Sequence, residues 1–111
     1  MCRSLRVMCV ATDAERLMAL KRASVGASWE LVGGATSLER LADDLAEWRP
    51  DVVVLEAAMA PAAVSRVRDV HPGIRLVAVG EAQGVDAVAE SLEGVRDAIL
   101  GVPKPGGPVT G

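Results

Sequence analysis

The sequence predicts an α/β domain in which five parallel strands form one doubly wound sheet. Apolar runs alternate with amphipathic stretches along most of the chain, a pattern typical of βαβ units with right-handed crossovers. Most of the apolar runs are continuous, as in strands that helices cover on both faces. The 111 residues suffice for one such core but not for two. We therefore expect the strand order 2-1-3-4-5.

The first strand is predicted over residues 5–10, which are mostly apolar. Thr12 and Glu15 have the spacing of a capping box, so we expect a helix from there to about Ser24. Residues 29–32 are predicted to form the second strand, and a pair of glycines ends it. An acidic residue inside this strand favours a position at the edge of the sheet.

The clearest predicted helix precedes the most apolar strand. A second capping box at residues 36–39 opens this helix, and Pro50 stops it. Its apolar residues fall on one stripe, whose members are Leu38, Leu41, Ala42, Leu45 and Trp48. Residues 51–55 are predicted to form a buried strand. Glu56 follows at the carboxyl edge of the sheet, where open α/β folds build their sites.

The last third of the chain is predicted from shorter signals. Pro61 suits the first turn of a helix that ends at residues 71–73, and residues 76–79 are expected to form the fourth strand. Residues 85–92 are expected to form a short helix. Residues 98–100 would then be the fifth strand.

Composition excludes several classes of function. Twelve basic and fifteen acidic residues give a net charge of −3, which argues against nucleic-acid binding. Cys2 and Cys9 are too few for a disulfide framework or a metal site, and they fit a reducing cytoplasm. No apolar run approaches the roughly 20 residues of a membrane span. Arg3 and Arg6 are not followed by the long apolar core of a signal peptide. We expect a cytoplasmic protein.

Several segments resemble a known family. Residues 30–36, 48–56 and 72–79, together with Lys104 and Pro105, are similar to the receiver domain of two-component response regulators. The likeness is strongest to receivers that precede winged or helix-turn-helix DNA-binding domains. It implies a CheY-like, flavodoxin-like fold and a role in signalling.

The similarity covers about residues 4–105, which is nearly all of the chain. We expect residues 1–102 to form the receiver-like domain. Residues 103–111 are rich in proline and glycine, and we expect a flexible tail or the start of a linker there.

The resemblance also identifies site positions, and most of them carry other residues here. Glu56 stands at the position of the phospho-accepting aspartate. Ala11 and Thr12 stand where the family has two adjacent acids that hold Mg²⁺, and Gly80 stands where it has Ser or Thr. Asp13 has two interpretations: it replaces the lost metal ligand if the loop slips by one residue, or its charge supports the helix N-terminus.

Two further family positions lie near the C-terminus. The switch aromatic of the fifth strand falls on an aliphatic residue, near Ala98 or Ile99. Lys104 matches the family lysine, at a longer spacing from the strand. It either pairs with Glu56 across the crevice or is a solvated lysine in the tail.

These departures predict that ordinary phosphorylation does not occur. Mg²⁺ needs oxygen ligands, but Ala11 offers none and Thr12 offers a neutral hydroxyl. Glu56 reaches one methylene further than aspartate, which displaces the attacking oxygen. With one histidine and two scattered cysteines, no catalytic constellation is visible. We therefore expect no metal, no cofactor and no enzyme activity.

The main functional hypothesis is a degenerate receiver, or pseudo-receiver, that acts as a phosphorylation-independent module for regulatory protein interactions. One alternative is a small-ligand sensor that uses the crevice at the carboxyl ends of strands one and three. The other is an atypical phospho-accepting receiver of a transcriptional regulator. Glu56 itself is either a mimic of phosphoaspartate or a solvated carboxylate at a strand end.

The sequence also predicts that the fifth helix of a receiver is missing or truncated. In a receiver this helix packs beside the first, so its loss would leave an apolar face of the sheet open. Open apolar faces usually mark an interface. We expect a protein partner or a homo-oligomer there, or a chain that is a fragment of a larger regulator or ATPase.

Overall fold

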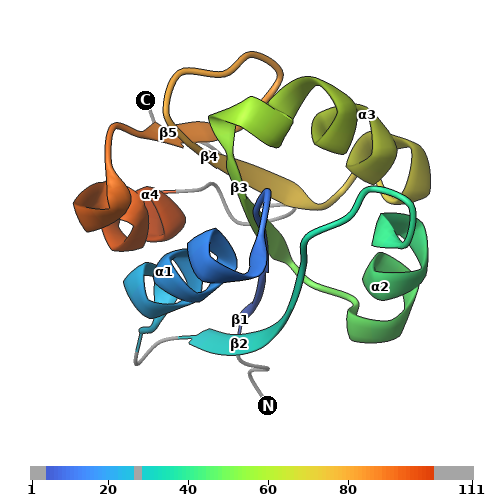
Figure 1. Cartoon of the computed structure of the whole chain (residues 1–111), viewed down its shortest axis with the longest axis horizontal. Helices are drawn as coiled ribbons and strands as arrows, with labels where there is room; N and C mark the ends of the chain where they lie inside the picture. Colours follow the sequence, from blue (N-terminus) through green and yellow to red (C-terminus); the bar gives the residue numbers. More distant parts are fainter. Residues whose placement is uncertain (1–4, 27–28, 102–111) are drawn as a thin grey trace.

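The computed structural model describes residues 5–26 and 29–101, which form a five-stranded parallel sheet with helices on both faces (Figure 1). The strand order is β2-β1-β3-β4-β5, as predicted. The strands are β1 (Leu5–Val10), β2 (Trp29–Ala35), β3 (Val52–Glu56), β4 (Arg75–Val79) and β5 (Ala87–Ala89). The helices are α1 (Ala14–Ser24), α2 (Leu41–Trp48), α3 (Ala60–Val70) and α4 (Val95–Gly101), with short 3₁₀ turns at η1 (Ala57–Met59) and η2 (Leu92–Gly94).

Each face of the sheet carries its own apolar core. Alternate side chains of a strand point to opposite faces, so Val53 belongs to one core while Val52 and Val54 belong to the other. The helices α2 and α3 cover the first core, and α1 and α4 cover the second (Figure 1). The continuous apolar runs of β1, β3 and β4 follow from this double coverage.

Neither predicted capping box forms. The cap of α1 is Asp13, whose side chain accepts a hydrogen bond from the Arg16 backbone N–H at 2.8 Å. Thr12 lies one residue before this cap, and its hydroxyl donates to Glu56. In the second box, Ser37 accepts from the Glu39 N–H in a turn, and α2 begins only at Leu41.

The glycine pair continues β2 instead of ending it. The strand runs on to Ala35, with an irregular register opposite Val7 and Met8. Gly33 lies against the indole of Trp48, so closely that a Cβ there would lie 3.0 Å from the ring. A side chain at this position would therefore have to displace the Trp48 ring, which packs α2 on the edge strand.

Two predictions in the last third of the chain are wrong. Residues 85–92, expected to be helical, contain β5, which pairs with β4. Residues 98–100, expected to be a strand, lie in α4. Val95 and Ile99 are buried one helical turn apart, while Leu100 is 64% exposed. Short apolar runs fit either period, and here the burial of residues four apart identifies the helix.

The described residues contain four α-helices, one fewer than a complete receiver, as predicted. The last of them, α4, is short and contacts α1 and β5, so it covers the face that was expected to be open. A loop over residues 80–86 connects β4 to β5 without an α-helix. Among residues 5–26 and 29–101, no helix has the length and apolar character needed to span a membrane.

Candidate functional site

The candidate site lies at the carboxyl edge of the sheet, where β1, β3 and β4 end. Ala11 and Thr12 follow β1, Glu56 is the last residue of β3, and Gly80 follows β4. Parallel strands bring these chain positions to one edge. The structure brings Thr12 and Glu56 into direct contact, as their positions in the sequence suggest.

Three hydrogen bonds hold the Glu56 carboxylate. Its Oε1 accepts from the Thr12 backbone N–H at 2.8 Å and from the Thr12 hydroxyl at 3.1 Å. Its Oε2 accepts from the guanidinium of Arg16 at 3.2 Å. The Glu56 side chain is only 18% exposed. Glu56 is therefore neither a freely solvated carboxylate nor a group projecting into an open crevice.

Arg16 is the residue that sequence reasoning missed. It lies in the first turns of α1, and its guanidinium also approaches the Asp13 carboxylate, with 3.7 Å between Nε and Oδ2. Its cationic group thus stands between two carboxylates at the site. The only sequence signal was its spacing, three residues after Asp13 on the helix that begins at the site.

The residues present do not fit a Mg²⁺ ion of the kind that receivers hold. Ala11 is fully buried, and its backbone N–H donates to the Ala35 carbonyl at 3.0 Å. The Asp13 carboxylate caps α1, which agrees with the helix-supporting interpretation and not with a slipped metal ligand. Glu56 already pairs with a cation from within the chain, Arg16. Oxygen donors for a divalent cation are thus committed elsewhere.

Gly80 has a backbone that disfavours the Ser or Thr of the family. Its φ is +98°, in a region that residues with a side chain rarely adopt. A Cβ on Gly80 would also lie 3.0 Å from the Cβ of Ala57. The conformation of the turn after β4 thus favours glycine over a residue that carries a hydroxyl.

The remaining predicted positions lie near the C-terminus of the chain. Ala98 and Ile99 lie in α4, so the equivalence with a residue of the fifth strand is wrong; β5 itself carries alanine and valine. Lys104 lies outside the described residues.

Comparisons with solved structures identify the fold. The receiver domain of AraT, a response regulator from Geobacillus stearothermophilus, matches with a TM-score of 0.72 and 15% identity, over 90% of this chain and 93% of that one. The receiver domain of RcsB from Salmonella enterica serovar Typhimurium, solved with the phosphomimetic BeF₃⁻, matches with a TM-score of 0.71 and 9% identity, over 88% and 87%. The response regulator domain of Thermotoga maritima CheB matches with a TM-score of 0.66 and 18% identity, over 91% and 100%.

No protein-family model matches the chain, and no curated protein matches it. The structural likeness nevertheless confirms the resemblance predicted from the sequence, at the level of the fold. The chain has the receiver-domain fold, while its acid pocket departs from the pattern of the family at Glu56, Ala11, Thr12 and Gly80.

Proposed function

We propose that this domain is a pseudo-receiver: a cytoplasmic, non-enzymatic module that regulates through protein contacts and without phosphorylation. The observation that carries the proposal is the bonding of Glu56 by Thr12 and Arg16. Phosphoryl transfer to a carboxylate needs a free oxygen and cations positioned around the incoming phosphoryl group. Here both carboxylate oxygens accept hydrogen bonds from the chain, and the nearby cation belongs to Arg16.

The test is incubation with acetyl phosphate and Mg²⁺, followed by intact-mass measurement. We expect no adduct of phosphate size on the wild-type domain. We expect none on Glu56→Asp either, because restoring aspartate does not restore the metal ligands. A receiver with a complete acid pair, treated in parallel, provides the positive control. An adduct that forms on the wild-type protein and disappears in Glu56→Gln would instead support the atypical phospho-acceptor.

The crevice at the carboxyl ends of β1 and β3 gives less support to the small-ligand alternative. Thr12 and Arg16 both donate hydrogen bonds to Glu56 there, so a ligand must displace these contacts to reach the carboxylate. A thermal-shift screen tests this alternative, since a ligand that binds only the folded state raises its melting temperature.

We further propose that the partner, or a second copy of the chain, binds over α1 and α4. Met18 on α1 is 53% exposed, and Leu100 on α4 is 64% exposed. Both are large apolar side chains on the helices that cover the second core. Light scattering tests for a homo-oligomer: a dimer that Leu100→Glu dissociates supports this interface. A monomer at micromolar concentration rules out self-association as its role.

A further inference from the structure

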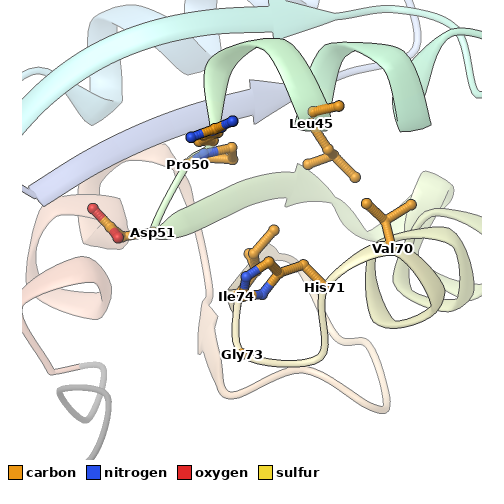
Figure 2. A pocket seen from close by; sticks show the side chains of 9 residues that line it. Leu45, Pro50, Asp51, Val70, His71, Gly73 and Ile74 are labelled. Carbon is orange, nitrogen blue, oxygen red and sulfur yellow. The ribbon is translucent and has the colours of Figure 1, made fainter.

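A groove of about 640 Å³ lies at the opposite edge of the sheet, between the C-terminal ends of α2 and α3 (Figure 2). Its volume falls within the roughly 300–1,000 Å³ typical of small-molecule sites. Its lining residues come from the end of α2, the turn before β3, the end of α3 and the turn between α3 and β4. None of them belongs to the candidate site around Glu56.

One part of the groove is apolar. Leu45 and Ile74 belong to the first core and contribute only a small apolar surface to the groove, since they are 3% and 4% exposed. Val70, at the end of α3, is 41% exposed. Figure 2 shows the side chains of Leu45 and Val70 pointing toward one another from α2 and α3, while Ile74 lies with His71 in the turn before β4. An aliphatic chain lying against these side chains would remove apolar surface from water.

The ionisable side chains of the groove favour an anion. Arg49 and His71, both exposed, line it. A guanidinium has only N–H donors and keeps its charge at any ordinary pH. The one acid, Asp51, accepts a hydrogen bond from the Arg6 backbone N–H at 2.9 Å. Figure 2 shows its carboxylate turned away from Leu45 and Val70.

The C-terminal ends of α2 and α3 oppose the binding of an anion. The C-terminal end of a helix carries a partial negative charge, which disfavours an anion. One carbonyl at each end is already satisfied, because the Arg49 N–H donates to the Leu45 carbonyl at 2.9 Å and the His71 N–H donates to the Val67 carbonyl at 2.8 Å. The helix ends therefore weaken the affinity for an anion, and the full charge of Arg49 determines the preference.

We propose that this groove binds a small organic anion with an aliphatic body, such as a medium-chain carboxylate. The guanidinium of Arg49 holds the anionic head, and Leu45, Val70 and Ile74 cover the chain. This binding activity goes beyond the proposed pseudo-receiver function. Neither proposal depends on the other.

Three probes with the same chain separate charge from apolar contact: octanoate, octylammonium and octanol. Each is titrated into ¹⁵N-labelled protein while backbone amide shifts are recorded. We expect saturable shifts with octanoate at the amides of Ala46, Arg49, His71 and Gly73, and weaker binding of the other two probes. Equal or tighter binding of octylammonium or octanol overturns the proposal, as does the absence of saturable shifts at these amides with octanoate.

The matched variants are Arg49→Asn and Arg66→Gln. Arg49 has a φ of +47°, and asparagine tolerates this left-handed backbone better than most residues, so Arg49→Asn removes the charge and preserves the fold. Arg66→Gln removes a charge from the exposed surface of α3, outside the groove lining. We expect octanoate to bind about three- to tenfold more weakly to Arg49→Asn and unchanged to Arg66→Gln. Equal losses in both variants, or no loss in Arg49→Asn, contradict a role for Arg49.

Discussion

At Gly80, the backbone conformation explains why the Ser or Thr hydroxyl of receivers is absent. Receivers have Ser or Thr at this position, whereas here the turn after β4 takes a φ of +98° and passes close to Ala57. The Gly80 N–H also donates to the Ala89 carbonyl at 2.8 Å, which joins the turn to β5. A residue with a side chain must therefore strain the backbone or move a strand end.

Gly80→Ser, which restores the residue type of the family, is expected to lower the free energy of unfolding by about 1–3 kcal/mol. The control is Gly94→Ser, because a Cβ on Gly94 would meet Ala89 at 3.8 Å, an ordinary contact. Urea denaturation measures both. Equal stability of the two variants would show that the turn adapts without strain.

Cys9 is a buried thiol on the second core, where its Sγ lies 3.5 Å from the Ser24 hydroxyl. Burial raises the pKa of this thiol from 9.0 to about 11, and the Ser24 hydrogen bond and Lys21 oppose the shift only in part. The folded state thus keeps a proton that the unfolded state loses above pH 9. The contribution of Cys9 to stability is complete below pH 9 and is lost as the pH rises toward 11.

We expect the free energy of unfolding to fall by up to about 2–3 kcal/mol over this interval because of Cys9. Cys9→Ala is the control. We expect it to be less stable than the wild type at neutral pH. It lacks the titration of the thiol but keeps every lysine, so the comparison isolates the effect of Cys9. The stability difference between wild type and Cys9→Ala should therefore shrink as the pH rises. A constant difference, measured by urea denaturation at several pH values, contradicts the shift.

At the scale of elements, the loop between β4 and β5 takes the place of a helix and is held by one side chain of α3. The Arg68 guanidinium donates to the carbonyls of Pro72, Ile74 and Gly84, at 3.2, 3.0 and 3.2 Å. It also pairs with the Asp86 carboxylate at 3.2 Å. The same carboxylate accepts from the Leu76 N–H at 2.8 Å, so the loop is fastened to both α3 and β4.

Arg68→Met keeps much of the aliphatic stem but removes these donors. We expect a loss of about 1–3 kcal/mol in stability, because the partly buried Ile74 carbonyl loses its donor and three exposed bonds are lost with it. Hydrogen exchange of the amides in residues 80–86 should also accelerate. Arg66→Met, at an exposed position of the same helix, should change stability by less than about 0.5 kcal/mol. If both variants have the stability of the wild type, Arg68 does not fasten the loop.

The elements were predictable where the apolar pattern was long, and less so where it was short. The runs that became β1, β3 and β4 are mostly apolar and are covered on both faces, so their assignment and order followed from sequence. β5 has three residues and α4 has seven. In segments this short, the spacing of apolar residues does not by itself distinguish a strand from a helix. The role of Arg16 depends on how α1 lies over β3, a tertiary relation that spacing along the chain does not contain.

At the scale of the whole molecule, β3 connects two separate features. Glu56 at its carboxyl end belongs to the candidate site, and Asp51 just before its first residue lines the groove. Five strand residues place these edges roughly 15 Å apart. The buried strand also belongs to both cores, through Val53 on one face and Val52 and Val54 on the other. The two cores should therefore unfold together.

Ile99→Ala tests whether the short helix α4 unfolds together with the two cores. Ile99 is 2% exposed and packs in the second core with residues of β1, β3 and β4. We expect a loss of about 2–5 kcal/mol, within a single unfolding transition that circular dichroism and tryptophan fluorescence report alike. Leu100→Ala, at a 64% exposed position of the same helix, should change stability by less than about 1 kcal/mol. If Ile99→Ala instead removed helical signal and left the main transition unchanged, α4 would be a separable element, and the face over α1 would be the open surface that the sequence predicts.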